Sequence, residues 1–550
     1  MEAPATAIPG RIAKASLIVL VAHQLLKLAG LAQAIVAGAL LERQELDAVY
    51  VLAFEQVIFA LFLVGEEIIG PTFLPVFSNL MREQGEAEAW RFAGHVLGLQ
   101  TLLLLVVAGM LTAWPVEMIR WLSSSYIDAN PERLALAASS VRYLAPALVV
   151  LSLGSTTYIL LNGYKRFFLA AFGDTAWKLI ALVALVAGAK LAGTPARWLV
   201  VGLAWGASAK LAVHVIGLWH ERRLWRIGLD FRHPGVRSMA LLALPVVVGV
   251  LLAKARDYMN NGYLLTTLDT PGLLAANSYG RKLYTTLAWL IPYPVSIAMF
   301  PFFCDMEAEG RRDKLAEIVT ASGRMVLAIT LPLSLVCVVL AEPLASLFFE
   351  WGKFDAQQVR WTAVSLQAYI LVLPAFSLEI FLMQAYFASR RMVSSVALGA
   401  FFSLLSVGLA WAGIVVLGAR GATALLVIAL SFTLCRTLKT VALVGVLRRS
   451  HPVFAGSDTG AFFARMAVCG FLSAAAVALT ECVFQALFSA TTKPIILMRC
   501  TAGSTAAVLV FIMTTKLLRL EEPKQMMAWA LRKLKERRGG GKDGTASAAP

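Results

Sequence analysis

The chain has 550 residues, of which 59% are hydrophobic, and it carries a formal net charge of +16. Its mean hydropathy of +0.74 excludes a soluble globular protein, because apolar runs long enough to cross a bilayer, about 20 residues each, recur along nearly the whole length. Much of the positive charge lies in short connections and at the C-terminus, so it does not indicate nucleic-acid binding.

Run length and periodicity predict an all-α polytopic membrane protein with about fourteen transmembrane helices. The predicted spans are 15–40, 48–78, 89–114, 136–162, 168–190, 197–219, 238–266, 272–304, 320–347, 359–387, 393–418, 421–447, 461–488 and 494–518. His23 and Lys27 interrupt the first apolar run, so we interpret it as a retained helix rather than a cleaved signal peptide.

Loop charge predicts the orientation. Alternate connections are rich in arginine and lysine, and the positive-inside rule places these in the cytoplasm. An even number of spans then places both termini there, with 1–14 as a short lead. Apolar residues recur at helical spacing in the very basic segment 521–550, which predicts an amphipathic helix on anionic lipid headgroups, followed by a disordered end. A solvated basic tail is the alternative.

Two regions share a plan. Phe-Leu-Pro-Val-Phe at 73–77 and Met-Phe-Pro-Phe-Phe at 299–303 are each followed by an acidic stretch and another apolar span. The repeat predicts two pseudo-symmetric lobes, 15–219 and 238–447, with two extra spans in 461–518. Repeated halves around a central site are a common plan of transporters.

Two neighbouring predicted spans, 238–266 and 272–304, contain charged residues. These residues are Lys254, Arg256, Asp257, Arg281 and Lys282. A charge at bilayer depth costs a few kcal/mol or more unless it faces a wet cavity or a partner. Four cations and one anion therefore indicate a water-filled, net-positive cavity that handles an anion. The alternative is a structural ion pair between Lys254 and Asp257, three residues apart, with Arg256 reaching towards the interface.

Further charges lie in the first two predicted spans. Lys27 is expected to line the cavity, the alternative being a partner for Glu55, Glu66 or Glu67. Glu66 and Glu67 are either a gate, pairing with a cation in one state and releasing it in another, or a helix-packing feature.

Signals for an enzyme are poor. The sequence has no P-loop, HExxH or GxSxG motif, and its six cysteines are scattered without a CxxC. We therefore predict a transporter without a bound cofactor. Coupling to sodium ions, protons or the membrane potential stays open, with Asp174 and Glu379 as acidic candidates.

Several motifs resemble the MurJ/MviN group of lipid-linked oligosaccharide flippases, within the multidrug/oligosaccharidyl-lipid/polysaccharide exporter superfamily. The most specific is Leu-Phe-Phe-Glu-Trp-Gly-Lys-Phe-Asp at 347–355, similar to the loop before the family's tenth span. The segments 34–37, 47–48, 73–77 and 279–283 also match in order. The arginines of the family's first two spans fall here on apolar or small residues, and that of the eighth span becomes Lys282.

The resemblance implies fourteen helices in two lobes around a cationic cavity, and alternating-access transport of an undecaprenyl-pyrophosphate-linked saccharide, most often lipid II. It implies a monomer in the bacterial inner membrane. The expected pyrophosphate-binding residues are Arg256, Lys282, Lys254, Lys27 and Arg281, and the expected gating or ion-pair residues are Glu66, Glu67, Asp257 and Asp47. The alternatives are a flippase for an O-antigen or exopolysaccharide unit and a non-transporting scaffold for envelope synthesis.

Overall fold

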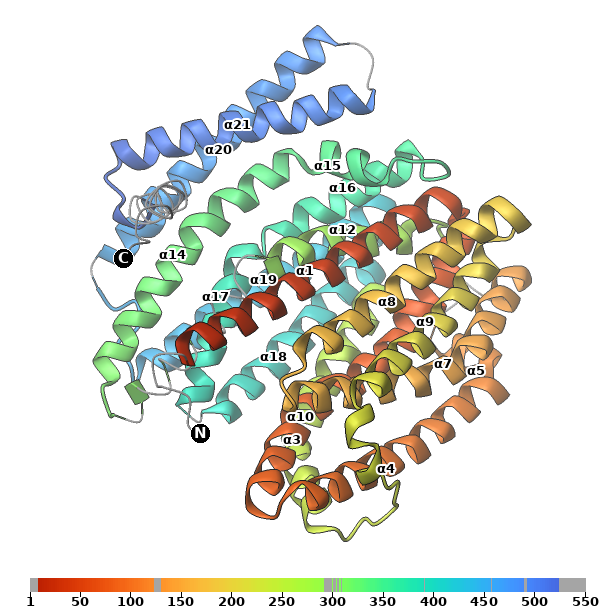
Figure 1. Ribbon diagram of the computed structural model, residues 1–550. Helices are drawn as coiled ribbons and strands as arrows, with labels where there is room; N and C mark the ends of the chain where they lie inside the picture. The colour runs from red at the N-terminus through yellow and green to blue at the C-terminus, as the bar shows by residue number, and fades with distance from the viewer. Residues whose placement is uncertain are drawn as a thin grey trace, which may run out of the picture. The chain divides into compact units, whose positions relative to one another are not determined.

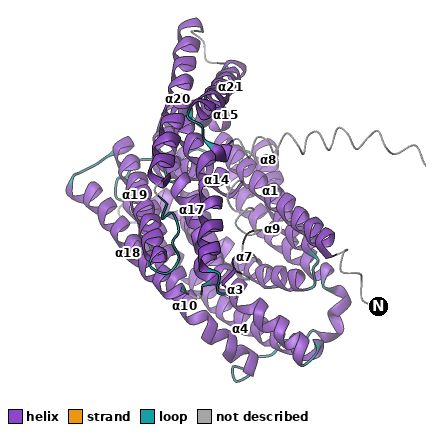
Figure 2. Cartoon of the chain, turned by 90° about the vertical axis from the view of Figure 1, so that its left-hand side faces the viewer, coloured by secondary structure: helices purple, strands orange, loops and turns teal. Residues whose placement is uncertain are grey.

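The computed structural model describes residues 8–122, 130–290, 309–389, 391–456, 458–488 and 492–523, and the single positions 299, 303, 306 and 307. Throughout this part the secondary structure is helical, without strands (Figure 2). The predicted all-α class is confirmed. Apart from its first three residues, the predicted amphipathic segment 521–550 lies outside the described part.

The helices are labelled in Figure 1. In the first half they are α1 (Ile8–Leu40), α2 (Arg43–Glu45), η2 (Leu46–Phe59), α3 (Ala60–Glu83), α4 (Glu86–Ala113), α5 (Pro115–Leu122), α7 (Pro131–Gly163), α8 (Phe167–Ala187), η3 (Gly188–Ala192), α9 (Pro195–Gly217) and η4 (Trp219–Leu224). In the second half they are α10 (Pro234–Tyr258), η5 (Met259–Tyr263), α11 (Leu264–Thr266), α12 (Leu273–Leu290), α14 (Arg312–Val339), α15 (Ala341–Phe349), α16 (Ala356–Ile370), α17 (Leu373–Ala388), α18 (Met392–Trp411), η6 (Ala412–Val416), α19 (Gly421–Arg448), α20 (Asp458–Leu487) and α21 (Lys493–Leu517).

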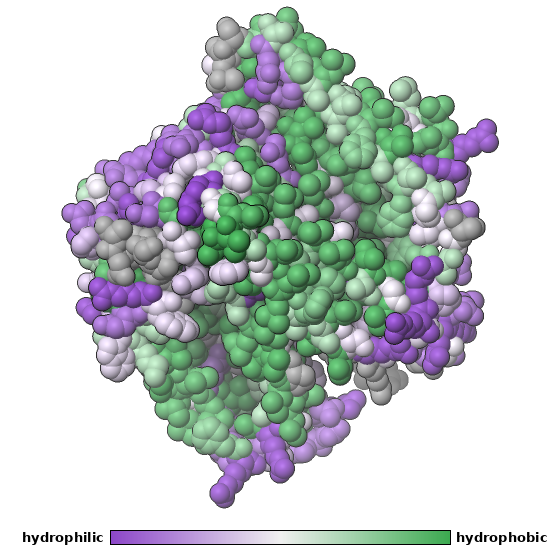
Figure 3. Space-filling model, turned by 180° about the vertical axis from the view of Figure 1, so that it is seen from behind, coloured by the Kyte–Doolittle hydropathy of each residue, from purple (hydrophilic) through white to green (hydrophobic). Residues whose placement is uncertain are grey.

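Ten of the described helices are long and apolar enough to cross a membrane, or twelve if each of two bent helix pairs is one span. These twelve correspond to twelve of the predicted spans. Of the other two, 15–40 lies in α1, and 272–304 begins in α12 and continues into residues outside the described part. The total of fourteen therefore stays a prediction. Hydrophobic side chains cover much of the face in Figure 3, as expected for surfaces in contact with lipid.

The chain divides into two compact units, each built from segments that are distant in the sequence. The first contains Met1–Thr286, Phe348–Ser365 and Gly399–Ser431. The second contains Leu287–Leu347, Leu366–Leu398 and Phe432–Pro550. The predicted lobe boundaries stay a prediction.

Small residues let helices approach closely in the first unit. α8 and α9 lie side by side (Figure 1), and a Cβ at Gly206 would lie 2.6 Å from the carbonyl oxygen of Trp177. At Gly202 a Cβ would lie 2.4 Å from that of Ala184. Lipid supplies no hydrophobic force between helices, so close van der Waals packing of this kind stabilises the pair.

One contact occurs in both units. His233 Nε2 lies 3.0 Å from Glu88 Oε1 in the first, and His451 Nε2 lies 2.8 Å from Glu307 Oε2 in the second. Both histidines precede a proline, and both glutamates belong to the acidic stretches of the predicted repeat. In each case the histidine lies in a loop after a long apolar helix, and it contacts a glutamate in the acidic stretch of its own half of the predicted repeat. The two contacts agree with that repeat.

Candidate functional site

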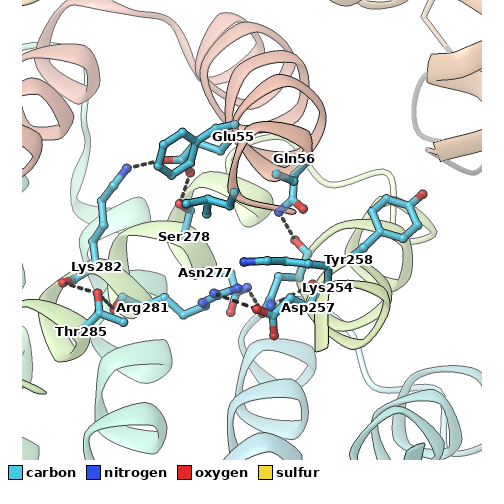
Figure 4. Close-up of a pocket in the computed structure, with 14 residues that line it drawn as sticks. Glu55, Gln56, Lys254, Asp257, Tyr258, Asn277, Ser278, Arg281, Lys282 and Thr285 are labelled. Atoms are coloured by element: carbon cyan, nitrogen blue, oxygen red, sulfur yellow. Dashed lines mark hydrogen bonds and ion pairs between the residues drawn. The ribbon is translucent and has the colours of Figure 1, made fainter. Parts of the chain in front are cut away.

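A polar pocket lies within the first unit, between η2, α3, α10, η5 and α12 (Figure 4). Its cavity volume is about 200 Å³, smaller than the roughly 300–1,000 Å³ typical of sites that enclose a whole ligand. The residues that line it are Glu55, Gln56, Phe59, Ala60, Leu63, Lys254, Asp257, Tyr258, Asn261, Asn277, Ser278, Arg281, Lys282 and Thr285. We call this the polar pocket below.

Buried amide side chains hold the helices around the polar pocket. At η5 the helix widens, and Asn260 Nδ2 donates to Ser406 Oγ over 3.0 Å. Asn277 Nδ2 donates to Asn261 Oδ1 over 3.1 Å, and Gln56 Nε2 donates to the Asn261 carbonyl over 3.3 Å. Because a buried polar group is costly unless hydrogen-bonded, these contacts favour one arrangement of η2, η5 and α12.

Asp47 holds the start of α12. Its buried carboxylate accepts hydrogen bonds from the backbone N–H groups of Gly272 over 2.6 Å and Ala275 over 2.8 Å. The first N–H groups of a helix have no partner within it, and a carboxylate there also interacts favourably with the helix dipole. Asp47 was predicted as a gating or ion-pair residue; the structure shows that it ties η2 to the helix that carries Arg281 and Lys282.

Lys282 forms the first charge pair of the polar pocket. Its Nζ donates to Glu55 Oε1, and to the hydroxyl oxygen of Tyr50 over 2.8 Å. Ser278 Oγ donates to the other oxygen of Glu55 over 2.6 Å. Glu55 was predicted only as an alternative partner for Lys27. In the structure it forms its ion pair with Lys282 instead.

Asp257 lies between two arginines. Arg256 donates to it over 2.7 Å. The guanidinium of Arg281 lies 3.7 Å from Asp257 on the side of the pocket (Figure 4). Lys254 donates instead to Glu67 of α3 over 2.6 Å. The alternative pair between Lys254 and Asp257 is therefore not formed.

The lining of the polar pocket contains three cations and two carboxylates, so it is net positive. Three residues that were predicted to be cavity cations belong to this lining: Lys254, Arg281 and Lys282. Arg256 does not; its guanidinium lies 3.4 Å from Ser403 Oγ and binds Asp257 from behind the lining.

Lys27 and Glu66 lie away from the lining. They interact electrostatically with each other, and Glu66 also interacts electrostatically with Lys210. Glu66 and Glu67 therefore serve different partners, as expected for adjacent helical residues about 100° apart. The gate formed by Glu66 and Glu67 stays a prediction.

Both acidic candidates for ion coupling have cationic partners. Asp174 lies 2.5 Å from Lys210, whose side chain is fully buried. In the second unit, Glu379 accepts hydrogen bonds from Arg436 over 2.8 Å and from Lys439 over 2.9 Å. These pairs neutralise carboxylates that would otherwise be costly at this depth.

Aromatic rings form a feature that the sequence analysis did not anticipate. Neighbouring ring centres lie 5.6–6.4 Å apart along a series that we call the aromatic column: Tyr279, Tyr50, Phe54, Phe59, Trp177 and Phe62. Three lysines lie against its ring faces, Lys282 at 4.4 Å from the Tyr50 centre, Lys178 at 4.1 Å from Trp177 and Lys210 at 5.0 Å from Phe62. The spacing of the four aromatic residues at 50–62 was the available signal, but it is equally typical of a core helix.

The segment 347–355, which carried the resemblance, closes against α1. Gly352 has a φ of +58°, and a Cβ there would lie 2.1 Å from the Ala39 carbonyl oxygen. Both the left-handed backbone and the close approach require glycine. Two residues later, the Phe354 ring is buried and stacks 5.4 Å from Tyr279.

Asp355 completes this closure. It accepts hydrogen bonds from the Arg43 guanidinium over 2.8 Å, and from the N–H groups of Gln357 and Gln358 at the start of α16 over 2.9 and 3.0 Å. Partial burial acts to raise the pKa of Asp355, but the hydrogen bond from Arg43 and those from the helix N–H groups outweigh it and hold the pKa below its ordinary value.

The model of the family described as "Lipid II flippase MurJ" matches residues 36–499. The chain belongs to the MurJ lipid II flippase family. The predicted resemblance is confirmed, and with it the prediction of a membrane transporter rather than an enzyme.

Individual relatives agree. A probable lipid II flippase MurJ of Rhizobium meliloti (strain 1021) is 26% identical over 371 residues, 64% of this chain and 68% of that protein. One from Rhizobium tropici is 26% identical over 413 residues, 71% of this chain and 73% of that protein.

Solved structures show the same fold. Lipid II flippase MurJ in an inward closed conformation superposes with a TM-score of 0.73 at 16% identity, covering 91% of this chain and 99% of that one. An inward-facing multidrug transporter of the MATE family superposes with a TM-score of 0.64 at 14% identity, covering 80% and 95%.

Proposed function

We propose that this protein is a flippase that moves lipid II, an undecaprenyl-pyrophosphate-linked precursor of peptidoglycan, across the bacterial inner membrane. One observation carries the proposal beyond family membership: a net-positive pocket is built into apolar, membrane-crossing helices. Charge at that depth is costly, and a transporter that moves an anionic headgroup needs it there. The headgroup would occupy the polar pocket while the lipid tail stays in the bilayer.

The pairing of the pocket cations supports an exchange mechanism. Lys282, Arg281 and Lys254 each contact a carboxylate, Glu55, Asp257 and Glu67 respectively. A diphosphate carries more charge than a carboxylate and offers more acceptor oxygens, so it competes for these cations on entry. When it leaves, the carboxylates re-form their pairs, and no cation stays uncompensated inside the membrane.

Arg256 and Lys27 have supporting parts in this proposal. Arg256 binds Asp257. When the diphosphate draws Arg281 away, Arg256 continues to neutralise that carboxylate. Lys27 interacts electrostatically with Glu66 of α3, which is the neighbour of Glu67 in the sequence. Release of Lys254 by Glu67 is the gating step that we propose.

The remaining expectations form part of the same proposal. Two lobes, 15–219 and 238–447, would rock about the pocket in alternating access, both termini would be cytoplasmic, and the protein would act as a monomer. The basic segment 521–550 would lie on anionic lipid headgroups.

Depletion of the protein in its own host, followed by mass spectrometry of membrane lipids, tests the substrate. We expect lipid II to accumulate. Accumulation of another undecaprenyl-linked glycan would refute lipid II as substrate, and no accumulated intermediate would refute transport. Deleting the chain from Pro523 onward tests the scaffold alternative: a flippase retains most of its function, whereas a scaffold that recruits enzymes through the tail loses it.

A further inference from the structure

We infer that Lys178 is a further diphosphate-binding residue of the transport site, held in reserve on the aromatic column until the substrate enters. The inference rests on the proposed function. It concerns a lysine of α8 that does not line the polar pocket in this state and to which the sequence analysis gave no role.

The surroundings of Lys178 are unusual for a charged side chain. Its Nζ lies over three ring faces, 4.1 Å from the centre of Trp177, 5.0 Å from Phe59 and 5.3 Å from Phe54. In the part of the chain that the structure describes, no carboxylate lies within ion-pairing distance of this Nζ. Ring faces attract a cation but supply no negative charge.

The other lysines of this region differ in this respect. Lys282 is paired with Glu55, Lys254 with Glu67 and Lys210 with Asp174. Recruiting any of these to a substrate leaves a carboxylate without its partner, which is strongly unfavourable in a low-dielectric environment. Recruiting Lys178 breaks contacts with rings and weakens its longer-range attraction to Glu55 and Asp174, but it breaks no ion pair.

Lys178 is also close enough to act. Phe59, whose ring it covers, forms part of the wall of the polar pocket. Lys178 interacts electrostatically with Lys282 and Glu55, which both line the pocket. A lysine side chain has a flexible four-carbon stem, so its ammonium group can turn towards an anion bound beside Phe59.

The chemistry fits a diphosphate better than a single phosphate. A substrate with two phosphate groups offers separate oxygens to Lys282 and to a second lysine. The mutual repulsion of Lys178 and Lys282 is relieved when a multivalent anion lies between them. Lys178 therefore adds affinity only once the anion has arrived.

The test is binding of three ligands to the purified full-length protein, measured by native mass spectrometry: undecaprenyl diphosphate, inorganic pyrophosphate and phosphatidylglycerol. Lys178→Met removes the charge but keeps an unbranched side chain that packs well on aromatic rings. Lys178→Arg restores the charge. Lys190→Met, at an exposed position in η3 at the end of the same span, is the matched control.

We expect Lys178→Met to weaken both diphosphate ligands about tenfold, equivalent to about 1.4 kcal/mol. We expect Lys178→Arg to bind within about threefold of wild type, Lys190→Met to be unchanged and phosphatidylglycerol to be unaffected. Unchanged diphosphate binding in Lys178→Met, or an equal loss for phosphatidylglycerol, would overturn the inference. If Lys282→Met weakens diphosphate binding and Lys178→Met does not, only the inference fails. If the wild type binds no undecaprenyl diphosphate, the proposed function fails with it.

Discussion

Variants of the ion pair between Lys282 and Glu55 can distinguish the contribution of a buried charge to stability from its contribution to substrate binding. Breaking a fully buried pair costs about 3–5 kcal/mol. These side chains keep 24% and 18% of their exposure, so solvent screening reduces the expected cost of Lys282→Met or Glu55→Gln to about 2 kcal/mol each. The double variant leaves neither charge uncompensated, so its cost should fall short of the sum by about 1–2 kcal/mol.

Thermal unfolding of the purified protein in detergent measures the stability of the three variants, and reconstituted vesicles measure lipid II transport. We expect the double variant to recover stability without recovering transport, because a diphosphate needs the cation. The exposed pair of Lys353 and Glu42, with side chains 47% and 70% exposed, is the matched control and should cost little. A double variant that transports as well as wild type would refute the binding role of Lys282. Strictly additive destabilisation would refute the pairing.

Three further perturbations follow from the structure. Asp47→Ala leaves the buried N–H groups of Gly272 and Ala275, at the start of α12, without acceptors and should cost about 2–4 kcal/mol. Asp47→Asn keeps one acceptor oxygen and should cost less. Equal melting temperatures of wild type and Asp47→Ala would contradict the capping role. The pKa of Asp355 is held below its ordinary value, so its contribution is present above about pH 4 and is lost as pH falls through the lowered pKa. The difference in melting temperature between wild type and Asp355→Asn should therefore be constant from pH 5 to 7 and become smaller below pH 4. A difference that becomes larger as the pH falls would contradict the lowered pKa of Asp355. The swap Lys254→Glu with Glu67→Lys keeps the pair but moves the cation to α3, so we expect stability to recover further than lipid II transport; full transport would contradict a need for the cation on α10.

The sequence was sufficient for the helical spans because the bilayer fixes their length and composition. Of the five cations predicted for the cavity, Lys254, Arg281 and Lys282 line the polar pocket, as the cost of a charge in lipid leads one to expect, whereas Arg256 and Lys27 do not. The partner that the sequence offered as an alternative for Lys254, Asp257, is not the one that Lys254 contacts. The side chain of Arg256 turns to its neighbour Asp257, while Lys254 crosses to another helix, and such choices depend on which helices are adjacent in space.

Two features were beyond sequence reasoning for related reasons. Asp47 reads as a charge at the start of a span, and its role depends on where α12 begins, more than 200 residues later. Lys178 reads as one intramembrane charge among several. Only the fold shows that aromatic rings rather than a carboxylate surround it.

The central claim is that the cations of the polar pocket carry a lipid-linked diphosphate across the membrane. The most direct measurement reconstitutes the purified wild type and the double variant Lys282→Met with Glu55→Gln in vesicles that contain labelled lipid II. The rate at which label in the inner leaflet reaches the outer leaflet is then followed. We predict rapid transfer with wild type and transfer at the protein-free rate with the variant at equal folded content. Wild-type vesicles that transfer no faster than empty ones, or equal rates for the two proteins, would contradict the claim.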